Sequence, residues 1–150
     1  MNQTLWGQVD FYTLPYGKMK TVLVIEDSMF VRENIAEMLL LAGYKVLKAE
    51  NGKIGLDKAM HHKADIVICD VMMPVMDGYA VLDEFKKRPE LEDIPFIFLS
   101  AKSRSEDIRR GIEAGADDYL IKPFQESELL NAVEAGLLKV TEQSKNSGTS

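Results

Sequence analysis

Charged side chains follow several short apolar runs of this sequence, at points where buried strands would end. Four residues occupy three such points: Glu26, Asp27, Asp70 and Lys122. A charge at the end of a buried strand costs free energy unless it is paired or used. The carboxyl ends of parallel strands form one edge of an open α/β sheet, where ligands bind. We therefore expect these four side chains to meet in one site.

Three carboxylates and a lysine in one place suit a divalent cation and a phosphoryl group. Two like charges about 4 Å apart repel by about 4 kcal/mol at an effective dielectric near 20, and a bound cation reverses that repulsion. Oxygen ligands without histidine or cysteine favour magnesium over zinc. Lys122 and the hydroxyl of Ser100, which ends a further apolar run, could bind phosphoryl oxygens. An aspartate can itself be the nucleophile and form an acyl phosphate.

The elements that must position these residues alternate along the chain. Short apolar runs predict five strands, at Thr21–Ile25, Tyr44–Ala49, Asp65–Cys69, Pro95–Leu99 and Asp118–Ile121. A segment with helical spacing of its apolar residues follows each run. Strands that alternate with helices predict right-handed crossovers and a parallel sheet that is covered on both faces. The expected fold class is therefore α/β, a doubly wound five-stranded parallel sheet with five helices.

Polar and glycine residues mark the expected helix ends. Ser28 caps the first helix and Gly43 stops it, whereas Asn51 caps the second. The third helix starts at Asp77, and the fourth is closed by Gly115. The last is expected over about residues 125–140.

Composition restricts the class of protein further. The chain has 150 residues, of which 46% are apolar, and this suits one globular domain. No apolar run approaches the roughly 18 residues of a membrane span, and no signal-peptide pattern is present at the N-terminus. Cys69 is the only cysteine, which fits a reducing cytoplasm. The net charge of −6 argues against direct binding of nucleic acid.

The sequence divides into three segments. Residues 1–18 contain turn formers and scattered aromatic residues without a period, and we interpret them as an N-terminal extension that is flexible or non-native. Residues 19–140 form the predicted domain. Residues 141–150 are polar and are expected to form a flexible tail.

From about Lys20 to Val140 the chain resembles the receiver domain of two-component response regulators, above all the single-domain chemotaxis type. The resemblance is carried by the motifs Val24-Ile25-Glu26-Asp27, Cys69-Asp70-Val71-Met72-Met73-Pro74, Asp77-Gly78, Leu99-Ser100-Ala101 and Lys122-Pro123-Phe124. These motifs are highly specific in combination.

The resemblance implies an acceptor and a metal site. Asp70 would accept a phosphoryl group. Asp27, Asp70 and the backbone carbonyl of Met72 would bind Mg²⁺, with Mn²⁺ as a substitute. Glu26, which replaces the more common aspartate, would act through a coordinated water.

The resemblance also implies a switch. Lys122 would pair with the acyl phosphate, and Ser100 would move inward to bind a phosphoryl oxygen. Tyr119 occupies the position of an aromatic residue that turns inward with it. Gly78 belongs to the motif after the acceptor, and the bond before Pro123 is a candidate cis peptide.

The expected function is a phosphorylation-controlled switch rather than an enzyme. A histidine kinase or a histidine phosphotransfer protein would supply the phosphoryl group. A downstream protein would bind the face formed by the fourth helix, the fifth strand and the fifth helix, beside Arg104, Arg109 and Arg110.

Three alternatives remain. A metal-dependent phosphatase with an aspartyl nucleophile is disfavoured because Met72 stands where such an enzyme needs a second acid. A phosphorylation-independent interaction module and a receiver fragment of a longer regulator are the others.

Overall fold

The computed structural model describes residues 19–148, and the surroundings of side chains as far as residue 140. Within this part, five parallel strands form one sheet in the order β2-β1-β3-β4-β5. The strands are β1 (Thr21–Ile25), β2 (Lys45–Ala49), β3 (Ile66–Asp70), β4 (Phe96–Ser100) and β5 (Asp118–Ile121). This arrangement confirms the predicted doubly wound parallel sheet.

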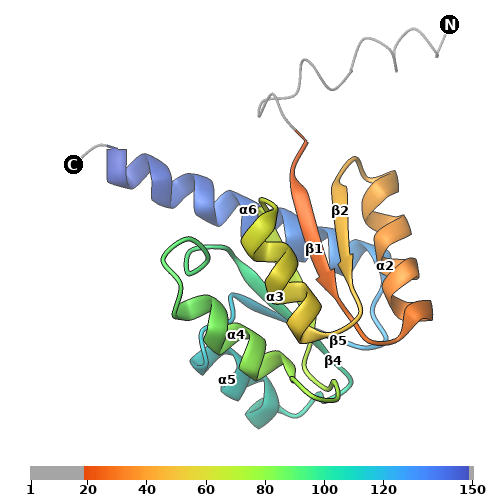
Figure 1. Cartoon of the computed structure of the whole chain (residues 1–150). Helices are drawn as coiled ribbons and strands as arrows, with labels where there is room; N and C mark the ends of the chain where they lie inside the picture. Colours follow the sequence, from red (N-terminus) through yellow and green to blue (C-terminus); the bar gives the residue numbers. More distant parts are fainter. Residues whose placement is uncertain (1–18, 149–150) are drawn as a thin grey trace, which may run out of the picture.

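Helices cover both faces of the sheet (Figure 1). Their bounds are α2 (Met29–Leu41), α3 (Gly52–His61), α4 (Gly78–Lys86), α5 (Ser105–Glu113) and α6 (Glu126–Gly148). One core cluster joins the sheet to α3 and α4 and includes Phe85 and Phe98. The other joins the opposite face to α2 and α6 and includes Leu39 and Leu129. The strands therefore present apolar side chains to two separate cores.

The three inner strands β1, β3 and β4 are almost wholly buried. Their runs of valine, isoleucine, leucine and phenylalanine are typical of strands covered on both faces. Phe96 packs edge-on against Phe85 and Phe98, with ring centroids 5.4 and 5.5 Å apart. A polar residue at the end of such a strand is therefore held in a fixed position.

The predicted helix caps are present. Asn51 accepts a hydrogen bond from the Ile54 amide at 2.8 Å. Asp77, predicted as the start of its helix, is the cap before it and accepts a bond from the Ala80 amide at 2.9 Å. Ser28 likewise accepts a bond from Val31, at 3.3 Å. Capping side chains satisfy amide groups that have no partner in the first helical turn. Gly43 and Gly115 take positive φ angles of 97° and 115°, as expected of residues that end a helix.

Several element boundaries differ from the prediction by one residue, and one helix is longer than predicted. Asp70 and Ser100 are the last residues of their strands rather than the residues after them. Helix α6 continues past Val140 to Gly148, although this segment was expected to be a polar tail. The segment contains glutamate, glutamine and lysine and no proline, and its one glycine, Gly148, is the last residue of the helix, so no helix breaker lies in its interior. The predicted extension 1–18 lies outside the described residues.

None of the helices described in residues 19–148 is long and apolar enough to cross a membrane.

Candidate functional site

Three carboxylates converge where β1 and β3 end. Oxygen atoms of Glu26, Asp27 and Asp70 all lie within 4.8 Å of one another. Strands β1 and β3 are neighbours in the sheet, and Ile25 is in register with Cys69, so the acids that follow them meet. Asp27 is exposed, whereas Asp70 and Glu26 are only 4% and 1% exposed. The predicted convergence of the acids is therefore present.

Both carboxylate oxygens of Glu26 are engaged. Its Oε1 accepts a hydrogen bond from Lys122 Nζ at 2.7 Å, and its Oε2 accepts one from the Ser28 amide at 3.1 Å. Its backbone carbonyl accepts a bond from Arg32 Nη1 at 2.8 Å. The Glu26 side chain, at the end of β1, thus reaches Lys122, which follows β5 on the other side of β3.

Lys122 lies between the two buried acids. Its Nζ is 2.7 Å from Glu26 Oε1 and 3.4 Å from Asp70 Oδ1, so the contact with Glu26 is the closer one. Burial alone would lower the pKa of the ammonium group. The hydrogen bond to Glu26 and the charges of both acids outweigh burial, and the pKa of Lys122 is raised.

The environment of Asp70 disfavours its charged form. Burial, followed by the neighbouring charge of Glu26, raises the pKa of Asp70 to about 7. Lys122 opposes this rise but does not cancel it. A positive charge placed next to Asp70 would therefore favour the ionised carboxylate.

The donor set fits a hard divalent cation. Three carboxylates supply oxygen ligands, which magnesium prefers, and neither histidine nor cysteine belongs to the cluster. One ammonium group offsets only part of the negative charge of three acids. A cation held by Asp27 and Asp70 would relieve the remaining repulsion.

Ser100 lies at the end of β4 and is fully buried. Its Oγ accepts a hydrogen bond from the Lys102 amide at 3.1 Å, which leaves the hydroxyl proton free to donate elsewhere. The carbonyl group of Lys102 accepts a bond from the Tyr119 hydroxyl at 3.0 Å. Ser100 and Tyr119 are therefore both tied to the backbone of one residue in the loop after β4.

The loop after β3 makes a tight turn. The amide of Met76 donates to the carbonyl of Pro74 at 2.7 Å, and Val75 between them has a positive φ of 71°. Gly78 then returns the chain to β3, with its amide donating to the Val71 carbonyl at 2.9 Å. A Cβ atom on Gly78 would lie 2.5 Å from the Asp70 carbonyl oxygen, so only glycine fits there.

The remaining predicted residues fall around this site. The Lys122–Pro123 bond is cis, as expected. The Met72 side chain is 57% exposed, and the predicted role of its carbonyl group stays a prediction. Arg110 stacks on the Tyr79 ring of α4, at 4.3 Å from the ring centroid.

Arg32 is a site neighbour that sequence reasoning missed. It is the fourth residue of α2, and its bond to the Glu26 carbonyl holds the end of β1 beside the helix. An arginine so soon after the two acids was a signal that could have been used, because one helical turn brings it back towards the strand end.

Comparisons with known proteins agree with this geometry. The family model "Response regulator receiver domain" matches residues 22–134. The chain is 37% identical over 118 residues to the phosphate regulon transcriptional regulatory protein PhoB of Pseudomonas aeruginosa, a match that covers 79% of this chain and 52% of PhoB. The chain spans about half the length of the curated relatives it matches.

Solved structures show the same fold. The chemotaxis response regulator CheY4 of Vibrio cholerae is 32% identical with a TM-score of 0.76, over 80% of this chain and 100% of that one. The receiver domain of the sensor histidine kinase PA1611 of Pseudomonas aeruginosa PAO1 is 28% identical with a TM-score of 0.74, over 80% and 98% of the two chains. That structure has a magnesium ion in its active site cleft. The family match and the conserved arrangement of sheet and helices lead to one conclusion: the chain belongs to the response regulator receiver domain family.

Proposed function

We propose that Asp70 accepts a phosphoryl group and that the phosphorylated domain signals by binding another protein. The observation that carries this proposal is the meeting of three carboxylates, within 4.8 Å of one another, with the ammonium group of Lys122. A phosphoryl transfer needs a nucleophile and positive charge beside it. Asp70 supplies the first and Lys122 part of the second.

The donor would be a phosphohistidine of a histidine kinase or a phosphotransfer protein. A carboxylate oxygen of Asp70 forms the bond to phosphorus while the phosphorus–nitrogen bond of the donor breaks. The electron pair of that bond stays on the imidazole nitrogen, which then takes up a proton. The product is an acyl phosphate, and the domain is a signalling module that modifies itself rather than an enzyme that acts on a substrate.

Asp27, Asp70 and the Met72 carbonyl would hold Mg²⁺, or Mn²⁺ in its place, with Glu26 acting through water. The cation neutralises charge on the phosphoryl oxygens when it is bound. The magnesium ion in the cleft of the related PA1611 receiver supports this assignment.

Lys122 would change partner during the reaction. Its nearest partner is Glu26 at 2.7 Å, and a phosphoryl group on Asp70 would offer a second set of negative oxygens. Ser100 would donate its free hydroxyl proton to a phosphoryl oxygen. Phosphorylation would then favour one position of the loop after β4, which is a population shift.

The downstream partner would bind the face of α5, β5 and α6. Arg104, Arg109 and Ile112 are exposed on α5 or directly before it, and Tyr119 of β5 is half-buried beside them. Cationic, apolar and aromatic side chains together are typical of protein interfaces. Because the curated relatives are about twice as long, the chain could also serve as the receiver part of a longer regulator.

Intact-mass spectrometry after incubation with acetyl phosphate tests the proposal. We expect one phosphoryl adduct that requires Mg²⁺, disappears with chelator and is absent from Asp70→Asn. Asp93→Asn, an exposed acid in the loop before β4, is the matched control and should be phosphorylated like the wild type. A folded wild-type protein that forms no adduct would instead support a phosphorylation-independent interaction module.

A further inference from the structure

Gly111 is a buried glycine in the last turn of α5, opposite two aromatic rings. A Cβ atom at this position would lie 2.8 Å from Cδ2 and 3.1 Å from Cε2 of Tyr119. It would also lie 3.1 Å from Cδ2 of Phe98. Real Cβ atoms do not approach ring carbons at 2.8 Å, so a side chain here would displace a neighbour.

The two rings differ in their freedom to move. Phe98 is fully buried in β4 and packs against the rings of Phe96 and Tyr79, at centroid distances of 5.5 and 5.0 Å. Tyr119 is half-buried in the edge strand β5, and its ring lies 6.3 Å from that of Phe98. A side chain at position 111 would therefore move the Tyr119 ring towards solvent.

Helix α5 itself is held in place on this side. Arg110, the residue before Gly111, stacks on the Tyr79 ring of α4 at 4.3 Å. A shift of α5 away from the sheet would break this contact. Rotation of the Tyr119 side chain costs less because solvent lies beside it.

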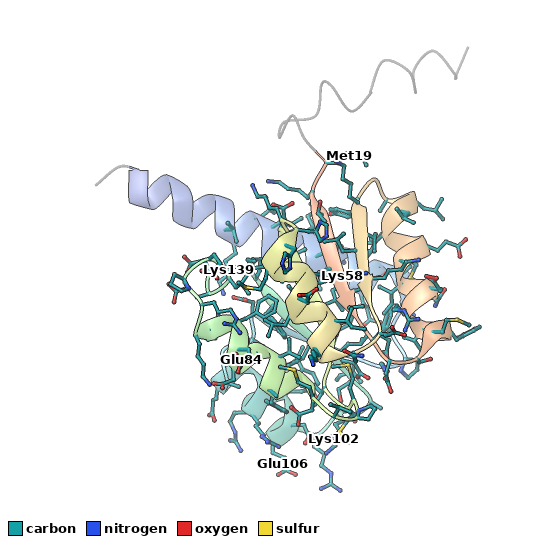
Figure 2. The ribbon with its side chains drawn as sticks, viewed as in Figure 1. Met19, Lys58, Glu84, Lys102, Glu106 and Lys139 are labelled. Atoms are coloured by element: carbon teal, nitrogen blue, oxygen red, sulfur yellow. The ribbon has the colours of Figure 1, made fainter. Side chains whose placement is uncertain are left out.

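The inward position of Tyr119 affects Ser100 through the backbone of Lys102. The Tyr119 hydroxyl donates to the Lys102 carbonyl at 3.0 Å, and the Lys102 amide donates to Ser100 Oγ at 3.1 Å. Figure 2 shows Lys102 close to Glu106, near the start of α5. An outward tyrosine would release the Lys102 carbonyl group and loosen the loop that anchors Ser100.

We propose that Gly111 is a positioning residue that, by lacking a side chain, allows Tyr119 to lie inward and thereby holds Ser100 through the backbone of Lys102. The role of Ser100 in this statement rests on the proposed function. The position of the Tyr119 ring does not depend on the proposed function, and it can be measured without any phosphodonor.

The first test is NMR of the full chain with ¹³C-labelled tyrosine rings, in which Tyr119 is assigned by its loss in Tyr119→Phe. In Gly111→Ala we expect the Tyr119 ring signals to move to a solvent-exposed position and the Lys102 amide signal to shift. Gly136→Ala is the matched control, because Gly136 is also a buried helical glycine and its added Cβ would meet Ile66 Cδ1 at 2.7 Å. This control should leave both signals unchanged.

An unchanged Tyr119 ring in folded Gly111→Ala would overturn the proposal, as would equal shifts in Gly136→Ala. If Gly111→Ala alone does not fold, the proposal is tested with the double variant that combines Gly111→Ala with Tyr119→Ala. Removal of the ring makes room for the new Cβ, so the double variant should fold. If this double variant did not fold, Gly111 would be required for packing against Phe98 and not for the position of Tyr119.

A second test follows the phosphoryl adduct formed with acetyl phosphate and Mg²⁺. We expect Gly111→Ala and Tyr119→Phe to lower the adduct level by a similar factor, about fivefold for one lost hydrogen bond. In a variant that combines Gly111→Ala with Tyr119→Phe the two effects should not multiply, because both substitutions remove the same contact. Multiplying effects would contradict the proposed route through Tyr119. Absence of an adduct in the wild type would contradict only the proposed function.

Discussion

Two buried carboxylates share one ammonium group at the end of the sheet. Glu26 takes the shorter contact with Lys122, at 2.7 Å, and Asp70 the longer one, at 3.4 Å. Because Asp70 is buried, and because one positive charge cannot neutralise two acids, its pKa is raised to about 7. The ionised form of Asp70, the residue proposed to accept a phosphoryl group, therefore destabilises the folded protein unless a further positive charge binds beside it.

This charge balance predicts that Asp70→Asn stabilises the metal-free protein at high pH. The pKa of Asp70 is about 7 in the folded protein and 3.8 in a model acid, so stability present below pH 4 is lost as the pH rises through 7. At pH 8 we expect the variant to gain about 1–3 kcal/mol in free energy of unfolding. At pH 4 the two proteins should be nearly equal. Urea unfolding in chelator measures both values.

The control for this prediction is Asp93→Asn, which removes an exposed acid in the loop that precedes β4. Its stability should follow that of the wild type at both pH values. A wild-type protein that becomes more stable between pH 5 and 8 in chelator would contradict the account of Asp70.

Magnesium should stabilise the wild-type protein. A cation that binds only the folded state stabilises it by about 1.4 kcal/mol at a concentration of ten times its dissociation constant. We expect Mg²⁺ to raise the melting temperature of the wild type and to have a smaller effect on Asp27→Asn. Equal gains in the two proteins would show that the acidic cluster is not the binding site. Differential scanning fluorimetry with and without chelator makes the comparison.

At the scale of elements, most boundaries follow from local chemistry. The caps Ser28 and Asn51 and the stop at Gly43 lie where the sequence predicted them, because caps and stops depend on local hydrogen bonds and backbone angles. Asp77, predicted as the first residue of its helix, is the cap directly before it. The end of α6 was not predictable in this way. Polar residues are compatible with a helix or with a tail, and composition alone does not separate the two.

The turn after β3 contains a conformation that the sequence did not signal. Val75 is β-branched and has a φ of 71°, within a turn closed by the Met76 amide and the Pro74 carbonyl. Turns of this kind are rare and strained, and β-branched residues are unfavourable at positive φ. Glycine or asparagine would have indicated the turn, whereas valine favours a strand.

Val75→Asn is therefore expected to stabilise the protein. Asparagine tolerates positive φ, and the Val75 side chain is fully exposed, so its removal loses no packing. We expect a gain of about 1 kcal/mol in the free energy of unfolding. Val75→Thr keeps the branched Cβ and should leave stability unchanged. Equal stability of all three proteins in urea unfolding would show that the turn carries no strain.

At the scale of the whole molecule, one sheet separates two apolar cores. Phe85 of α4 lies in one core and Leu129 of α6 in the other, and both are at most 1% exposed. The inner strands contribute side chains to both cores. Loss of packing on either face should therefore destabilise the same folded unit.

We expect Phe85→Ala and Leu129→Ala each to cost about 2–5 kcal/mol in free energy of unfolding, with a single cooperative transition. Leu138→Ala, in the same helix as Leu129 but 43% exposed, should cost less than about 1 kcal/mol. Circular dichroism and intrinsic tyrosine fluorescence during unfolding should give coincident curves. Two separate transitions would show that the faces fold independently.

The sequence predicted the doubly wound parallel sheet from its alternating apolar runs and helical segments, and the meeting of the acids from their places at strand ends. It did not predict which acid pairs with Lys122, because that depends on side-chain reach across β3. It also missed Arg32, although its contact with Glu26 is local along the chain, and the crowding at Gly111, which depends on how α5 packs against β4 and β5.

The central claim is that Asp70 becomes an acyl phosphate. Borohydride reduces an aspartyl phosphate to homoserine, so peptide mass spectrometry after reduction identifies the modified residue. After treatment with acetyl phosphate and Mg²⁺, we expect homoserine at position 70 and unchanged residues at positions 26 and 27. Homoserine at position 27, 2-amino-5-hydroxypentanoic acid (the reduced form of a glutamyl phosphate) at position 26, or no reduced residue in a folded protein would contradict the account.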